Sequence, residues 1–244
     1  MNSFAPSGIR ARFLAEVERA SARFQEPAQL CKVCVLVLPI ARAGITIQQP
    51  DMRAEVLCAS DDVVERVEWL QATLGEGPGL DAIASSGPVL ASDLTVKEGR
   101  WPAFATEAVG LGIAAMYAMP LQVGAIQVGV LDLYRDVAAP LTAEDFADAV
   151  VVADLLTAIL LTQTERIDGQ LSSWWDQALV AREVHQATGM VTVQLGVSAR
   201  EAYVRMQAFA YAEGRLLGDI AHEVVHRRLR FDPDVASGPL NPGP

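Results

Sequence analysis

The sequence predicts an α+β protein with an N-terminal antiparallel sheet and flanking helices, a linking helix, and a C-terminal three-helix bundle. Before residue 135, short apolar stretches bounded by turn residues occur in a hairpin-prone order, with helical segments before and between them. Residues 178–231 instead show helical periodicity three times, with glycines between the repeats. The chain has 244 residues, of which 51% are hydrophobic and 20% charged, which suits two globular domains.

The first part begins with an amphipathic helix over residues 7–26 that places Ile9, Phe13, Val17 and Ala20 on one face. Residues 108–131 carry no charge, but prolines and glycines interrupt them, so we interpret them as buried strands and expect no membrane span. The expected elements are strands at 33–38, 44–48 and 55–59, a helix capped by Asp61 or Asp62 that runs to Gln71, a turn-rich segment at 74–94, a helix from Trp101 to Gly110, and strands at 114–119 and 125–134.

The linking helix follows, with Thr142 as its expected N-cap. Residues 146–161 are apolar almost all round, and one sheet covers only one face of a helix. We therefore predict a homodimer formed through this helix and the N-terminal helix.

The closing bundle carries clear helix boundaries. Gly196 ends the first helix, and Ser198 begins the second with Glu201 three residues later, which is a capping box. Gly214 stands where a left-handed C-cap is expected, and the third helix begins near Arg215. Three amphipathic helices alone indicate no function.

The order and spacing of residues over this bundle resemble the ANTAR module. The resemblance implies an RNA-binding domain, usually dimeric, that binds paired hairpins in a nascent transcript and prevents a terminator from forming. Thr188 and Ala181 depart from the family pattern, where a lysine and an arginine are usual. The matching residues are Val184 to Met190, Leu195 to Ser198, Glu201, Ala202, Ala210, Leu217 and Asp219 to Ala221.

Charge is compatible with RNA contact in the bundle alone. Residues 171–231 carry seven arginines and six acids, for a net charge of +1, whereas the whole chain carries −11. A polyanion is therefore repelled by the rest of the chain. We predict that RNA contact rests on a few placed arginines and on bases stacked against aromatic rings. The candidate RNA-binding residues are His185, Thr188, Arg200, Tyr203, Arg205 and Arg215.

The first part is similar to GAF domains of the actinobacterial type over about residues 10–165. The resemblance implies an antiparallel sheet with a small-ligand pocket on one face, for which the candidate lining residues are Cys58, Trp101, Phe104 and Tyr117. No histidine precedes His185, which argues against haem, and we expect no cofactor. The motifs that carry the similarity are Gly75 to Pro78, Gly87 to Val89, Asp93-Leu94, Arg100 to Pro102, Gly110 to Gly112, Pro120-Leu121 and Gly129 to Tyr134.

Two other functions stay open. Residues 222–226 read His-Glu-Val-Val-His, the pattern of zinc hydrolases in which two histidines hold zinc and the glutamate activates water. A zinc site of this type needs a third protein ligand, and only Asp232 and Asp234 follow as candidates. We therefore expect neither a bound metal nor an enzyme. Alternatively, the bundle is a protein-interaction adaptor that no longer binds RNA, as Thr188 and Ala181 suggest.

Cysteine usage and the termini complete the expectations. Cys31 and Cys34 on a strand would face opposite sides, which favours buried core cysteines over a redox pair. Three cysteines and no signal sequence indicate a cytoplasmic protein. We expect a sensor domain at 7–165, with its linking helix from 142, an RNA-binding domain at 171–231 and a disordered tail at 232–244.

Overall fold

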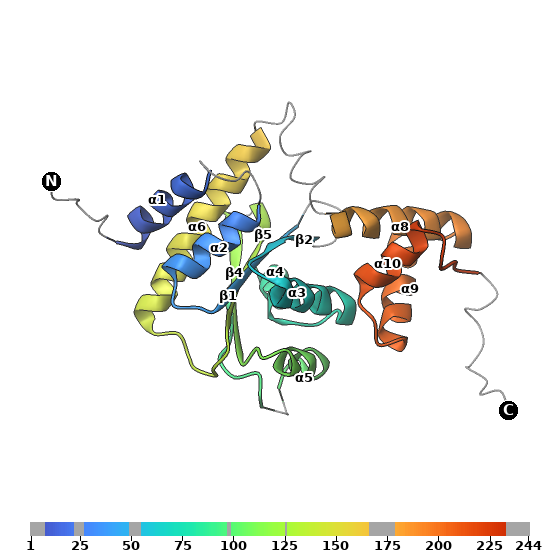
Figure 1. The fold of residues 1–244 in the computed structure, drawn as a ribbon, viewed down its shortest axis with the longest axis horizontal. Helices are drawn as coiled ribbons and strands as arrows, with labels where there is room; N and C mark the ends of the chain where they lie inside the picture. Colours follow the sequence, from blue (N-terminus) through green and yellow to red (C-terminus); the bar gives the residue numbers. More distant parts are fainter. Residues whose placement is uncertain are drawn as a thin grey trace. The chain divides into compact units, whose positions relative to one another are not determined.

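The computed structural model describes residues 8–21, 27–48, 55–96, 99–124, 126–165 and 179–232. The chain divides into two compact units, Met1–Ala178 and Leu179–Pro244, and each is described by itself (Figure 1). Gly169, Trp174 and Trp175 of the expected junction, and the expected tail from Pro233 onward, lie outside the described residues.

A five-stranded sheet in the order β2-β1-β5-β4-β3 forms the centre of the first unit, and every neighbouring pair is antiparallel. This confirms the predicted antiparallel sheet and the predicted hairpin between its last two strands. The strands are β1 (Arg42–Ile47), β2 (Glu55–Ala59), β3 (Val89–Ala91), β4 (Ala115–Val123) and β5 (Ile126–Arg135).

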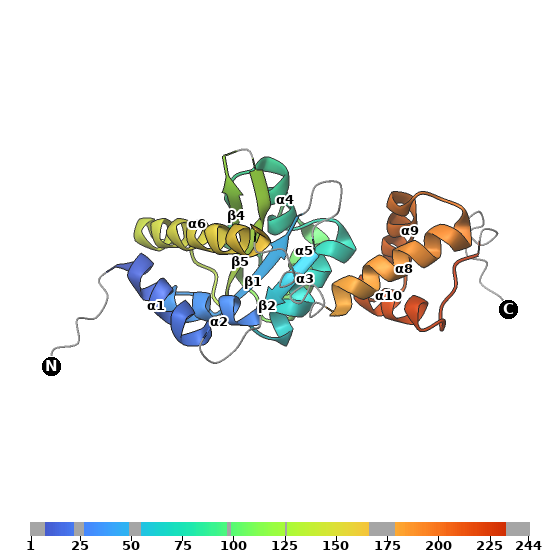
Figure 2. The same ribbon diagram turned by 90° about the horizontal axis from the view of Figure 1, so that it is seen from above.

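Helices cover both faces of this sheet (Figures 1 and 2). On one face, α2 and α6 contact the strands and α1 contacts both of these helices. On the other face, α3 contacts β1 and β2 while α4 contacts β3, β4 and β5, and α5 contacts α3. The helices are α1 (Ile9–Ser21), α2 (Ala28–Val37), α3 (Asp62–Leu74), α4 (Pro78–Ser85), α5 (Pro102–Gly110) and α6 (Ala143–Glu165).

The second unit is a bundle of three helices, as the periodicity predicts. Its helices are α8 (Leu179–Leu195), α9 (Ala199–Ala212) and α10 (Leu217–Val225), and each contacts the other two. Among the residues that the structure describes in either unit, no helix is long and apolar enough to cross a membrane.

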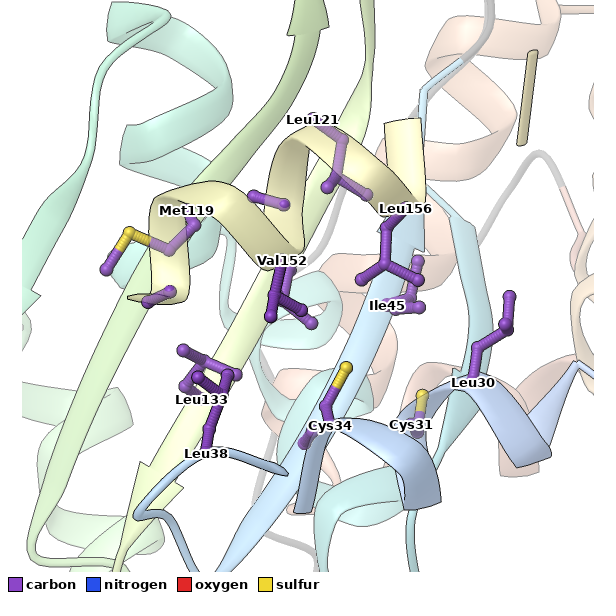
Figure 3. Packing of buried hydrophobic residues seen from close by; sticks show 14 of the residues in the cluster. Leu30, Cys31, Cys34, Leu38, Ile45, Met119, Leu121, Leu133, Val152 and Leu156 are labelled. Atoms are coloured by element: carbon purple, nitrogen blue, oxygen red, sulfur yellow. The ribbon is translucent and has the colours of Figure 1, made fainter. Parts of the chain in front are cut away.

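The main apolar core lies between the sheet and the helices α1, α2 and α6. Val152 and Leu156 of α6 point towards the strands, where Ile45 and Leu133 meet them (Figure 3). Phe13 is fully buried here, and Ile9, Val17 and Ala20 pack against the same cluster, which confirms the predicted apolar face of α1.

The predicted strand at 33–38 is wrong, because these residues belong mostly to α2. A short run of apolar residues gives no period that separates a buried strand from a buried helix. The correction moves the cysteines: Cys31 and Cys34 lie on the same side of α2 (Figure 3). Both are buried, and the Cys31 sulfur lies 2.8 Å from that of Cys58. Burial raises the pKa of the Cys31 and Cys34 thiols, which disfavours the reactive thiolate.

The segment 74–94, expected to be turns, contains α4 and β3. Pro78 occupies the first turn of α4, where its missing N–H leaves no hydrogen bond unmade. Gly77 precedes it with φ 149°, a conformation that favours glycine. Helix α4 has only eight residues. In so short a segment, the glycines and the proline at its start indicate a turn more strongly than the spacing of its apolar residues indicates a helix.

Glu76 in this segment connects it to α5. One oxygen of its carboxylate accepts hydrogen bonds from the backbone N–H groups of Ala103 and Phe104, both at 2.8 Å. These amides lie in the first turn of α5, where helices lack internal acceptors. The carboxylate therefore fixes where α5 begins.

A cluster of buried polar side chains joins α3 to the sheet. The Tyr134 hydroxyl donates to Glu68 Oε1 at 2.7 Å, and Thr46 donates to Glu68 Oε2 at 3.2 Å. The Gln71 amide donates to Glu68 Oε2 at 3.3 Å and to Asp132 Oδ2 at 3.2 Å. Asp132 Oδ1 is buried without a hydrogen-bond partner among the described residues. Two carboxyl groups thus share one dry region of the first unit.

Glycines make room for this cluster. A Cβ at Gly44 would lie 2.2 Å from Glu68 Oε1, and a Cβ at Gly79 would lie 2.5 Å from Asp132 Oδ2. The Gly79 N–H also donates to Gln71 Oε1 at 2.8 Å. Any larger residue at these two positions would displace a carboxylate from its hydrogen bonds.

Burial also sets the protonation of the cluster. It raises the pKa of Asp132 well above its ordinary value, and the neighbouring Glu68 charge raises it further. Burial likewise raises the pKa of Glu68, against the lowering effect of its hydrogen bonds. Two carboxylates in a dry site repel each other, so the folded unit retains protons that the unfolded chain releases.

We expect the first unit to lose stability as the pH rises from the ordinary pKa of a carboxyl group towards the raised folded-state pKa of Asp132. Folding raises the pKa of Asp132, so the folded state binds this proton more tightly than the unfolded chain does. The folded state is therefore favoured at low pH. This advantage is lost as the pH rises through the folded-state pKa. Urea unfolding at several pH values measures the effect. Asp132→Asn should reduce the slope, whereas exposed Asp93→Asn should not, because the pKa of Asp93 is lowered. An unchanged slope in Asp132→Asn would contradict the assignment.

Candidate nucleic-acid interface

The bundle of the second unit is held by a small apolar core. All three predicted core residues of the third helix, Leu217, Ile220 and Val224, are fully buried. The core is completed by Val184, Ala187 and Val191 of α8, Ala202, Met206 and Ala210 of α9, and Ala221 of α10. Four of these residues are alanines, whose small side chains let the helices pack closely. This packing determines which face of each helix points to solvent.

Capping residues define the corner between α8 and α9. Gly196 has φ 66°, and its N–H donates to the carbonyl of Thr192 at 2.9 Å. The Ser198 hydroxyl accepts from the N–H of Glu201 at 3.2 Å, as predicted. The Glu201 carboxylate pairs with Arg205 at 2.6 Å rather than reaching back, so only half of the predicted capping box forms.

The next two helix ends share one geometry. Gly214 has φ 61°, and the following N–H donates to the carbonyl of Ala210, which confirms the predicted C-cap. After α10 the same pattern recurs with Arg227, at φ 58°. The N–H of Arg228 donates to the carbonyl of Glu223 at 2.7 Å. An arginine thus occupies a backbone conformation that favours glycine, at a cost on the order of 1–3 kcal/mol.

The free face of α8 carries one of its two candidate RNA-binding residues. His185 is exposed, in a row with Gly189 and Val193 at helical spacing, and the Val193 side chain is 84% exposed. Desolvation lowers the pKa of His185, so this ring is neutral at pH 7 and suits stacking rather than ion pairing. Thr188 is half-buried, and its hydroxyl donates to the carbonyl of Val184 at 2.7 Å.

The free face of α9 carries a second row, formed by Arg200, Val204 and Tyr211. Tyr211 is 64% exposed, whereas Tyr203 is half-buried. Tyr211 is therefore better placed than Tyr203 to stack on an unpaired base. The sequence alone does not show which of these two tyrosines is exposed.

The arginines fall into two groups. Arg205 pairs with Glu201, and Arg215 pairs with Glu223 at 2.9 Å, so the charges of these two candidates are neutralised within the bundle. The exposed Arg200, Arg227 and Arg228 form no ion pair among the described residues. The last two were not among the candidates, although the sequence His226 to Arg230 signals a basic cluster. Among the arginines of the bundle whose side chains the structure describes, those without an ion pair therefore lie at Arg200 and just after α10.

The four residues predicted to line a ligand pocket in the first unit do not gather at one place. Cys58 and Tyr117 belong to the main core beneath α2 and α6. Trp101 and Phe104 lie at the start of α5, outside that cluster, and the Trp101 ring N–H donates to Asp81 Oδ2 at 2.8 Å. Cys58 and Tyr117 thus face the layer of α2 and α6, whereas α5 packs against α3 in the other layer, and the sequence order does not reveal this separation.

The His-Glu-Val-Val-His sequence forms the C-terminal part of α10 and its C-cap, and its glutamate is paired with an arginine. Both carboxylate oxygens of Glu223 lie against Arg215, at 2.9 and 3.1 Å. The acid that meets His222 is Glu183 of α8, whose Oε2 lies 3.0 Å from His222 Nδ1. Asp232 pairs with Arg230, at 3.7 Å, and Asp234 lies outside the described residues. The partner of the histidine pair thus comes from another helix, not from the tail.

Comparison with protein families matches residues 177–225 to the ANTAR domain. A search of curated proteins finds no match. The ANTAR match contains all of α8, α9 and α10, which the sequence resemblance also singled out.

Among solved structures, the GAF domain of a phosphoenolpyruvate-protein phosphotransferase from Acinetobacter is 11% identical, with a TM-score of 0.50, over 66% of this chain and 98% of that one. The GAF domain of such an enzyme from Coxiella burnetii is 13% identical, with a TM-score of 0.47, over 64% and 97%. The phycocyanobilin-bound GAF domain of a cyanobacterial phytochrome is 9% identical, with a TM-score of 0.48, over 68% and 100%. The Acinetobacter likeness shows the fold alone. The chain therefore combines a GAF-like fold with an ANTAR domain at residues 177–225.

Proposed function

We propose that this chain is a transcription antiterminator whose ANTAR domain binds paired hairpins in nascent RNA and whose GAF-like unit controls that binding. The ANTAR match over residues 177–225 carries the proposal. The geometry of the bundle supports it, because free arginines and exposed rings remain on its surface after the internal ion pairs are made.

The proposed RNA contacts divide by chemistry. Arg200, Arg227 and Arg228 supply unpaired guanidinium groups for phosphates. Tyr211 and His185 supply planar rings for bases in a hairpin loop. Arg205 is paired within α9 and Arg215 is paired with Glu223 of α10, so these two guanidinium groups are less available to phosphates.

Dimerisation is the second part of the proposal. On α6, Ala147, Val151, Asp154, Ala158 and Leu161 recur at alternating spacings of four and three, the pattern of a coiled-coil seam. Ala147 and Ala158 are exposed, and Val151 and Leu161 are half-buried. Helix α1 of the same chain contacts α6 as well, so part of the apolar surface is covered internally. We propose that the seam pairs with its copy in a second chain, which doubles the contacts available to one RNA.

We expect Arg200→Ala to weaken binding of an RNA with two short hairpins by about tenfold, which corresponds to about 1.4 kcal/mol. The salt dependence of affinity should also become shallower, because one phosphate contact is lost. The measurement is a filter-binding or anisotropy titration at several salt concentrations. Arg66→Ala removes an exposed helical arginine from the first unit and serves as the matched control. Equal affinity in both variants would count against this interface.

Arg227→Gly separates folding from RNA binding. Glycine relieves the left-handed conformation at this position, so the bundle should become more stable by about 1 kcal/mol. RNA affinity should nevertheless fall, because a free guanidinium is lost. Thermal unfolding and RNA titration of the same preparation test this. A variant that is more stable and binds RNA with unchanged affinity would remove Arg227 from the interface.

Ala158→Arg is expected to convert the dimer to a monomer, because a long charged side chain replaces a small one in the seam. Light scattering coupled to gel filtration gives the mass directly. The position is exposed in the single chain, so its fold should persist. Ala84→Arg, at an exposed alanine of α4, is the matched control. A variant that remains dimeric would place the interface elsewhere.

A further inference from the structure

Three metal-ligating side chains converge on one side of the bundle. Glu183 comes from α8, and His222 and His226 come from α10 and its C-cap. One ligand atom from each lies within 4.8 Å of the other two. The packing of α8 against α10 brings them together across 39 residues of sequence, so the arrangement depends on the folded bundle.

The tautomer of His226 suits metal binding. Its Nδ1 lies 2.8 Å from the carbonyl oxygen of His222. A carbonyl only accepts hydrogen bonds, so Nδ1 carries the proton and donates it. The other ring nitrogen, Nε2, therefore holds the free lone pair. An imidazole whose Nδ1–H binds a backbone carbonyl is the arrangement typical of a histidine metal ligand.

The spacing of the other two groups fits a shared ion as well. His222 Nδ1 lies 3.0 and 3.2 Å from the two oxygens of Glu183. A carboxylate only accepts hydrogen bonds, so this nitrogen carries a proton in the ion-free protein, and a bound ion takes the place of that proton. Two ligands bound tetrahedrally at about 2.0–2.1 Å are themselves about 3.3 Å apart. The two histidine rings lie side by side, with centroids 4.0 Å apart and planes inclined by 34°. Only small side-chain movements would be needed for all three to meet one ion.

The donor set indicates the class of ion. Two imidazoles and one carboxylate suit zinc and similar divalent transition metals rather than calcium or magnesium, which prefer oxygen ligands. His222 and Glu183 have side chains that are 47% and 23% exposed, so solvent can reach the site and complete the coordination. Glu223, engaged with Arg215, takes no part.

We propose that Glu183, His222 and His226 form a binding site for a zinc-class divalent ion, which cross-links α8 to α10. The ion holds the C-terminal end of α10 against α8, and the free arginines Arg227 and Arg228 follow directly after it. The charge of +2 on the ion is then the largest local charge at the site. The proposal does not require hydrolysis and stands independently of RNA binding.

The test uses the full chain, made without a polyhistidine tag and treated with chelator. Calorimetric titration with zinc should show one ion per chain, and cobalt should give the visible absorption of a tetrahedral complex. Excess zinc at ten times its dissociation constant should raise the melting temperature of the bundle by at least about 4 °C. Glu183→Gln and His226→Gln should each weaken zinc binding by about tenfold or more and reduce this shift to about a third or less.

Two controls separate this site from its alternatives. His185→Gln removes the one histidine of the chain that is outside the proposed site, and Glu223→Gln removes the glutamate of the hydrolase pattern. Both should bind zinc as the unaltered chain does, and far-UV circular dichroism should show equal helicity in all four variants. If Glu183→Gln fails to fold, His226→Gln decides the outcome. Absence of zinc binding, equal binding in every variant, or a loss in Glu223→Gln with none in Glu183→Gln would overturn the proposal.

Discussion

Burial of β5 on both faces is the constraint on which the first unit depends. Leu131 and Leu133 point into the main core, so the alternate residues Asp132 and Tyr134 must point into the opposite layer. A carboxyl group there requires polar partners and a proton, which Gln71 and the raised pKa of the carboxyl provide. The glycines before and within α4, the position of α3 and the close approach of β1 all follow from accommodating this cluster.

The second unit is a small bundle that keeps arginine side chains on its surface, so its stability depends on its core and its helix caps. Alanines in the core bring the helices close, and caps at Gly196, Ser198 and Gly214 satisfy the backbone groups at the corners. Two acids neutralise Arg205 and Arg215, and these ion pairs lie within α9 or between its end and α10. Among the described side chains of this unit, Arg200, Arg227 and Arg228 form no ion pair, so a bundle of weak net charge still offers guanidinium groups for the proposed RNA contacts.

The chemistry open to residues His222 to His226 depends on the side chains that contact them from other helices and loops. The helix places both histidines on one side, as the spacing requires, and directs Glu223 to Arg215. The third acid arrives from α8, through packing that the pentapeptide does not encode. A motif known for hydrolysis thus contributes two of the three side chains of the proposed inter-helix metal site, while its own glutamate pairs with Arg215.

The sequence by itself determined the antiparallel sheet, the closing bundle, its caps and the apolar face of α1, because each is written in a local period or a turn residue. It did not determine that residues 33–38 are helical, since an unbroken apolar run fits either element. It also missed α4, in which Gly79 makes room for the distant Asp132 carboxylate rather than forming a turn. Only the tertiary structure decided which arginines are neutralised, which tyrosine is exposed and that Glu183 meets the two histidines. Those outcomes depend on contacts between residues far apart in the chain, and no local pattern records them.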